Sequence, residues 1–173
     1  VAVKINDLVD PSNVIVTCRK LGIKSYLPPV LSLTLGSAEV SMLEMSKAYS
    51  AIANSGVKVD PVSITKIEDR NGNELFRHTI QQSRVYDANV VNTLVDMMKG
   101  VPLYGTGRAA LINRPMAGKT GTTSDYRDAW FFGFIPQMLT VAWVGNNDNT
   151  PMNEVTGGLM PARMWHVYMV FAA

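Results

Sequence analysis

The sequence predicts a mixed α/β (α+β) fold, with helices in the first part of the chain and an antiparallel sheet packed with helices in the last part. Apolar residues recur at three- and four-residue steps in several segments before residue 100, which is typical of amphipathic helices. Three strand-like segments then follow one another, and a final amphipathic segment indicates a helix that packs on them. The strands are expected at Pro115–Thr122, Ala129–Ile135 and Leu139–Val144, and the helix at Leu159–Phe171.

Composition narrows the class of protein. The chain has 173 residues, of which 47% are hydrophobic and 17% charged, so it can bury a core as one globular domain. A net charge of +2 without a run of basic residues argues against nucleic acid as a partner. No uncharged apolar segment reaches the length of about eighteen residues that a transmembrane helix needs.

Metal and cofactor chemistry also lack support in the sequence. Cys18 is the only cysteine, so neither an intrachain disulfide nor a cysteine metal cluster can form. Neither His78 nor His166 has another His, a Cys or an Asp at ligand spacing. The loop Gly105–Arg108 resembles a phosphate cradle only superficially. We therefore expect no metal ion and no cofactor.

Proline and glycine divide the predicted helices. Residues 1–10 have apolar side chains at near-helical spacing, and a second helix is expected over Ser12–Leu21, ended by Gly22. The pattern from Ser41 to Asn54 predicts a further helix. Between them, Leu31–Gly36 is expected to be a short apolar loop or strand.

A hairpin and one more helix precede the sheet. Val62–Ile67 alternates and is β-branched, Asn71-Gly72 is a strong turn signal, and Glu74–Phe76 returns, which predicts a hairpin standing as an appendage to the main sheet. Asp87 is expected to cap a helix over Ala88–Gly100.

The run Lys119-Thr120-Gly121-Thr122-Thr123 is the main candidate for a functional site. It brings a cation, hydroxyl groups and unhindered backbone together where a strand opens into a turn. Such a site suits a substrate that carries a carboxylate and a carbonyl. Taken alone, the triplet Lys-Thr-Gly would more simply be an exposed strand end with a solvated lysine.

Several further segments accompany this run in a fixed order. Together they resemble the transpeptidase domain of class A, bifunctional penicillin-binding proteins, over nearly the whole chain. The resemblance implies the fold of penicillin-recognising serine enzymes, D,D-transpeptidase activity that cross-links peptidoglycan, and binding of D-Ala-D-Ala stem peptides and β-lactams. It also implies a membrane-anchored parent at the outer face of the cytoplasmic membrane. The segments are Leu33–Val40 with Leu43–Met45, Tyr104–Ala110, Gly118–Thr123, Asp128–Phe131, Trp143–Asp148 and Thr156–Gly158.

The resemblance gives each residue of the candidate site a role. Lys119 would bring a positive charge to the catalytic serine and help proton transfer. The hydroxyls of Thr120 and Thr122, with Thr123 beside them, would bind the substrate carboxylate, and Gly121 would leave room for the substrate. The backbone N–H of Thr122 would form half of an oxyanion hole.

The chain departs from the family where the nucleophile is concerned. The family's Ser-x-x-Lys motif has two formal matches, Ser55–Lys58 in a glycine-containing turn and Ser63–Lys66 on an expected strand, and both are interpreted as chance. No Ser-x-Asn triplet occurs. We therefore expect residues 1–173 to be the C-terminal part of a single transpeptidase domain, inactive alone, whose other motifs lie upstream. In relatives the last strand pairs with that upstream part, so Leu139–Val144 is expected to have an open edge that allows a homodimer.

Two alternatives remain. One is a hydrolase of the same superfamily, a β-lactamase or D,D-carboxypeptidase, and the other is a non-catalytic module that binds D-Ala-D-Ala or β-lactams. Near the site, Asp128 and Arg127 are expected to make a structural contact, and Trp130 and Trp143 are expected to pack on the sheet.

Overall fold

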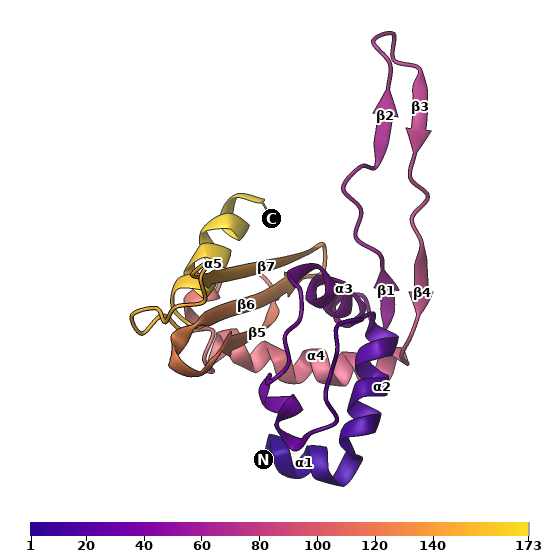
Figure 1. Ribbon diagram of the computed structural model, residues 1–173. Helices are drawn as coiled ribbons and strands as arrows, with labels where there is room; N and C mark the ends of the chain where they lie inside the picture. The colour runs from indigo at the N-terminus through magenta and orange to yellow at the C-terminus, as the bar shows by residue number, and fades with distance from the viewer. Residues whose placement is uncertain (173) are drawn as a thin grey trace.

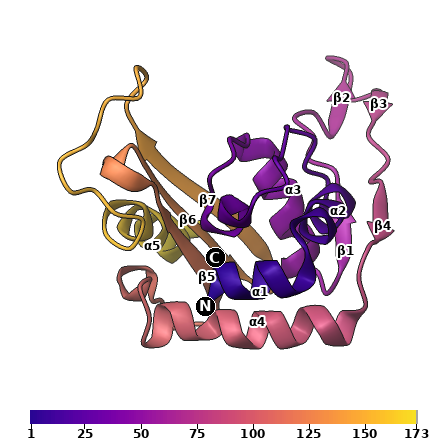
Figure 2. The same ribbon diagram turned by 60° about the horizontal axis from the view of Figure 1, so that its bottom comes forward.

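The structure, a computed structural model, describes residues 1–172. Helices formed by the first part of the chain lie beside a three-stranded sheet, and a narrow two-stranded ribbon projects away from both (Figure 1). Helix α4 runs along one side of the molecule, from the base of the ribbon to the sheet (Figure 2). The helices are α1 (Ala2–Val9), α2 (Pro11–Leu21), α3 (Met42–Ala53), α4 (Ala88–Leu103) and α5 (Met160–Ala172), with short 3-10 helices η1 (Leu31–Leu35), η2 (Arg108–Ala110) and η3 (Ser124–Tyr126). The strands are β1 (Val57–Val59), β2 (Lys66–Glu68), β3 (Glu74–Arg77), β4 (Gln82–Arg84), β5 (Ala117–Thr122), β6 (Asp128–Ile135) and β7 (Met138–Gly145).

The two predicted caps, Gly22 and Asp87, are confirmed, and Asp10 is a further cap that was not predicted. The Asp10 side chain accepts a hydrogen bond at the start of α2, and Gly22 ends that helix in the left-handed region with φ of 104°. Asp87 caps α4 through its side chain. The predicted end of α4 is wrong by one turn, because the helix continues past Gly100 and includes Pro102.

Glu44 fastens the start of α3 to the loop before it. Its carboxylate accepts hydrogen bonds from the Ser25 hydroxyl and from the backbone N–H groups of Lys24, Ser25 and Ser41. These hydrogen bonds lower the pKa of Glu44 to about 2, and the bond from the Ser25 hydroxyl has the largest effect. In the same region, the expectation of a loop or strand at Leu31–Gly36 fits only in part, because η1 forms there and buries Leu33.

The predicted hairpin is an appendage, as expected. β2 pairs with β3 around the turn at Asn71-Gly72, where Gly72 has a φ of 83°. Nearer the body of the molecule, β1 pairs with β4 in a second short ladder that the sequence did not predict. The expected strand is displaced: β2 begins only at Lys66, so Ser63 lies before it.

The sheet has the order β5-β6-β7 and is antiparallel, which confirms the three predicted strands. Because side chains alternate along β6, its two faces pack against different helices. Phe131 faces α5, where its ring meets Trp165 edge-on with centroids 5.6 Å apart. Phe132 faces α3, where its ring stacks on Tyr49 with centroids 4.3 Å apart. Burial in this stack raises the pKa of Tyr49 to about 12.

Trp165 lies at the centre of the core on the α5 side. It is fully buried with Phe131 and Met169, and its indole N–H donates to the Gly133 carbonyl at 3.1 Å. A side chain at Gly133 would not fit, because its Cβ would lie 2.5 Å from the Trp165 ring. The helix that closes the chain is thus held to the sheet by both packing and a buried hydrogen bond.

One strand edge and one helix face are left uncovered. Within residues 1–172, β7 pairs with β6 only, so its other edge is open. In addition, α5 carries a stripe of apolar side chains that are about half exposed or more, at helical spacing: Met160, Met164, Val167, Tyr168 and Phe171. No helix in the described part of the chain has the length and apolar character needed to span a membrane.

Candidate active site

The outer edge of β5 offers backbone groups to a ligand. β5 pairs with β6 on one side and, in the described residues, with no strand on the other. The N–H of Thr123 donates to the Asp128 carbonyl across this pair at 3.0 Å. Because backbone groups alternate in direction along a strand, the N–H groups of Gly121 and Lys119 also point to β6, while those of Thr120 and Thr122 point to the open edge. The backbone N–H expected to serve an oxyanion therefore faces outward.

Lys119 reaches the same edge from one face of the sheet. It pairs in register with Phe132, so its side chain starts on the face that α3 covers. Its ammonium is exposed and donates to the carbonyl of Thr120 at 2.6 Å. That carbonyl points to the open edge, so the positive charge lies where an extended ligand would run.

The hydroxyls of Thr120 and Thr122 lie on the opposite face, two residues apart on one strand. The Thr120 hydroxyl is 2.6 Å from that of Thr106, which lies in the loop after α4. The Thr122 hydroxyl accepts a hydrogen bond from the Gly157 N–H at 3.1 Å. Thr123 differs from these two, because its hydroxyl accepts the Asp128 N–H at 2.7 Å and closes the turn between β5 and β6.

Two glycine-containing loops pack against β5 on the face that carries the Thr120 and Thr122 hydroxyls. A Cβ on Gly157 would lie 2.2 Å from the Trp130 carbonyl oxygen, and a Cβ on Gly158 would lie 2.1 Å from the Thr106 carbonyl oxygen. A Cβ on Gly107 would lie 2.9 Å from the Phe131 ring. Only glycine allows the loops to approach so closely. The segments around Thr106 and Gly157, to which no role was assigned from the sequence, therefore lie side by side against the threonine face of the Lys119–Thr122 run.

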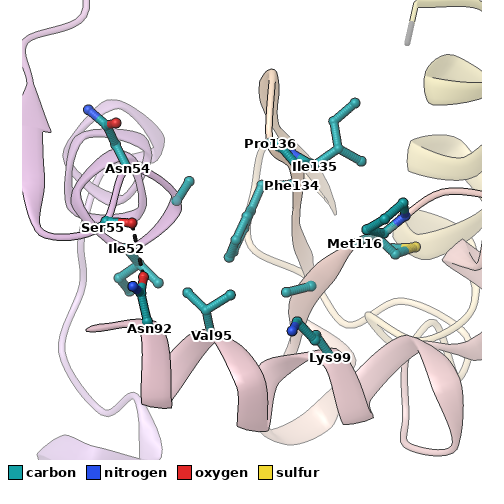
Figure 3. Close-up of a pocket in the computed structure, with 13 residues that line it drawn as sticks. Ile52, Asn54, Ser55, Asn92, Val95, Lys99, Met116, Phe134, Ile135 and Pro136 are labelled. Carbon is teal, nitrogen blue, oxygen red and sulfur yellow. Dashed lines mark hydrogen bonds between the residues drawn. The ribbon is translucent and has the colours of Figure 1, made fainter. Parts of the chain in front are cut away.

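Neither formal Ser-x-x-Lys match forms a serine–lysine pair. The Ser55 hydroxyl donates to the Asn92 side chain at 2.9 Å, at the rim of a cavity of about 360 Å³ between α3, α4 and the start of β5 (Figure 3). Lys58 instead donates to the Lys20 carbonyl at 3.4 Å. In the second match, Lys66 pairs with Glu68. The cavity in Figure 3 is lined by the Pro115–Ala117 end of the strand, away from the open edge at Thr120–Thr122.

The connecting loop corrects one expectation. Asp128 does not pair with Arg127: its carboxylate accepts the indole N–H of Trp143 at 2.9 Å. Arg127 lies 3.9 Å from the Asp125 carboxylate instead. Trp143 and Trp130 pack together on the sheet, with ring centroids 6.1 Å apart, as expected.

Comparison with known proteins identifies the family. The family model described as "Penicillin binding protein transpeptidase domain" matches residues 23–163. The chain belongs to this family. Curated members include penicillin-binding protein 1A of Aquifex aeolicus, 37% identical over 170 residues, and penicillin-binding protein 2D of Bacillus subtilis, 32% identical over 177 residues. Each alignment covers 97% of the chain but only 23% and 25% of the respective relative, so the chain spans about a quarter of their length.

Solved structures of the family have the same fold. PonA1 of Mycobacterium tuberculosis, solved in complex with penicillin V, is 25% identical and has a TM-score of 0.81, covering 92% of this chain and 49% of its own. Penicillin-binding protein 1A of Haemophilus influenzae is 23% identical with a TM-score of 0.87, covering 99% of this chain and 32% of its own. The predicted family and fold class are therefore confirmed.

Proposed function

We propose that this chain forms the carboxylate-binding and oxyanion-binding part of a serine D,D-transpeptidase. In that reaction a serine attacks the penultimate D-Ala carbonyl of a stem peptide, the C–N bond breaks, and terminal D-Ala leaves. An amine of a second stem peptide then attacks the acyl-serine ester, which forms the cross-link and frees the serine. A β-lactam would acylate the same serine.

This proposal rests on the open edge of β5. A stem peptide lying extended along the edge could use the outward backbone groups of Thr120 and Thr122, as a strand added to a sheet does. Its terminal carboxylate would accept from the two threonine hydroxyls. The Lys119 ammonium, at the same edge, would bring a positive charge to the attacking serine and help proton transfer. The outward N–H of Thr122 would stabilise negative charge on the attacked carbonyl, a contribution worth about 100- to 1,000-fold in turnover. Thr123 would contribute by holding the turn that ends the strand.

The nucleophile is proposed to lie outside these residues. Neither Ser55 nor Ser63 has a lysine partner, and the relatives are about four times as long as the chain. We infer that residues 1–173 are the C-terminal part of one transpeptidase domain, and that the rest of the domain covers the β7 edge and the α5 stripe. The domain would act on peptidoglycan at the outer face of the cytoplasmic membrane, where that polymer is built.

Labelling with a fluorescent penicillin tests the function. The chain alone should remain unlabelled, whereas the full-length protein that contains it should form a stable adduct on a serine upstream of Val1. An adduct on Ser55 or Ser63 of the isolated chain would overturn this assignment. Saturable binding without any adduct in the full-length protein would favour the non-catalytic module, and rapid turnover of the penicillin would favour a β-lactamase.

The isolated chain is proposed to dimerise through the open edge of β7. An unpaired strand edge is a template for pairing with a second copy, and the exposed apolar side chains of α5 add further surface to bury. Light scattering over a range of concentrations should give a dimer, and the β7 amides should exchange slowly with deuterium. A monomer at every concentration, with fast-exchanging β7 amides, would contradict this proposal.

A further inference from the structure

The two threonine hydroxyls of the site each have one proton to give. A hydroxyl is one donor and an acceptor, whereas a carboxylate only accepts. Thr120 and Thr122 can therefore bind an anion only if both protons point toward it. The group of the protein that hydrogen-bonds to each hydroxyl oxygen decides whether the hydroxyl proton is free to point toward the anion.

At Thr122 the hydrogen-bond partner within the protein is a backbone N–H, which can only donate. The Gly157 N–H donates to the Thr122 oxygen at 3.1 Å, and an N–H cannot accept a proton in return. The Thr122 hydroxyl therefore keeps its own proton free to donate to a bound anion.

At Thr120 the group behind the oxygen is a second hydroxyl. Thr106 and Thr120 hold their oxygens 2.6 Å apart, and either can be the donor. If Thr120 gives its proton to an anion, Thr106 must give its own proton to Thr120. The two bonds then form a chain in which each strengthens the other.

We propose that Thr106 is a positioning residue for the substrate carboxylate: its hydroxyl donates to Thr120 and thereby directs the Thr120 proton into the site. This inference rests on the proposed function, because it concerns the same carboxylate. Thr106 does not touch the substrate; it acts through Thr120, as the Gly157 N–H acts through Thr122.

The loop that carries Thr106 is held firmly enough for this role. The Gly105 N–H donates to the Gly100 carbonyl at 2.8 Å, and the Gly107 N–H donates to the Val101 carbonyl at 3.0 Å. Gly158 packs directly on the Thr106 carbonyl. Both neighbours of Thr106 are thus tied to the end of α4, so its hydroxyl has a fixed place opposite Thr120.

Thr106→Val and Thr106→Ser form a matched pair for the test. Valine has the shape of threonine without the hydroxyl, and serine keeps the hydroxyl. In the full-length protein, the acylation rate by a penicillin should fall about five- to tenfold in Thr106→Val and stay within about twofold of wild type in Thr106→Ser, as the loss of one hydrogen bond predicts. The methyl ester of the same penicillin, which lacks the anion, should react equally with all three proteins. An equal loss for acid and ester would overturn the proposal in favour of a merely structural role.

A second measurement does not depend on catalysis. In the 173-residue chain, NMR couplings report the χ1 rotamer of Thr120. The rotamer should be single in wild type and in Thr106→Ser, and averaged in Thr106→Val. An unchanged Thr120 rotamer in Thr106→Val would overturn the positioning role, whereas failure of the wild-type full-length protein to react with penicillin would count against the proposed function alone.

Discussion

Replacing Gly157 by alanine tests whether the loop behind β5 sets the shape of the candidate site. Gly157 is buried, and an alanine Cβ there would lie 2.2 Å from the Trp130 carbonyl oxygen and 2.4 Å from the Gly121 carbonyl oxygen. Real Cβ atoms essentially never come closer than 3.0 Å, so the loop must retreat by at least 0.8 Å, the difference between 3.0 Å and 2.2 Å. Both obstructing atoms belong to the backbone of paired strands, which cannot turn aside as a flexible side chain would.

The cost has three parts. Overpacking of this kind costs about 1–3 kcal/mol. Withdrawal of the loop also weakens the bond from the Gly157 N–H to Thr122, worth about 1 kcal/mol. Against this, alanine lowers the entropy of the unfolded chain, which returns about 0.4–1 kcal/mol. The net loss should be about 1–3.5 kcal/mol, with a fall in Tm of about 2–4 °C for each kcal/mol.

Urea unfolding followed by circular dichroism measures this loss, and Gly121→Ala is the matched control. Its Cβ would meet only the Trp130 side chain, with the Trp130 Cβ nearest at 3.3 Å, so a shift of a few tenths of an ångström accommodates it. Gly121→Ala should remain within about 0.5 kcal/mol of wild type, since the entropy gain offsets the tight contact. If Gly157→Ala were as stable as Gly121→Ala, the contact between loop and strand would not be the constraint described here.

Three further predictions concern the core, the α3 cap and the site. Trp165→Ala should cost about 3–5 kcal/mol in urea unfolding, because it empties the core and leaves the Gly133 carbonyl without its donor; a loss below about 1 kcal/mol would count against that packing. The pKa of Glu44, ordinarily 4.5, falls to about 2 on folding, so the Glu44 carboxylate stabilises the fold fully above pH 4.5 and this contribution is lost as the pH falls through about 2. In Glu44→Gln, the free energy of unfolding should therefore decrease less as the pH is lowered from 4.5 to 2. An unchanged pH dependence would refute the role of the cap. Lys119→Met should slow penicillin acylation of the full-length protein by about 100-fold or more without lowering Tm, since Lys119 is exposed, and an unaltered rate would remove it from the proposed chemistry.

Local signals were sufficient to predict most of the fold. Gly22 and Asp87 act at helix ends through their own neighbours, so the sequence alone reveals their roles. The turn at Asn71-Gly72 is likewise a local property. The three sheet strands follow one another directly, which is why their antiparallel order was predictable.

Features that depend on distant partners were not predictable. The ladder between β1 and β4 joins two three-residue strands, too short to give an alternating pattern. Thr106 meets Thr120 across 14 residues, and Gly157 meets Thr122 across 35, through contacts that only the folded chain creates. The sequence therefore marked Lys119–Thr123 as a site through its residue types and the family resemblance, but not the loops that hold its hydroxyls or the separate use of Thr123 in the turn.

The projecting ribbon has a practical consequence for handling the protein. In the described residues β2 bonds to β3 alone, and an isolated hairpin is only marginally stable in water. Its tip should open long before the sheet does, and trypsin should cut after the exposed Arg70. The two pieces would stay joined through the body of the molecule, so this tip is a suitable point for inserting a reporter without disturbing β5.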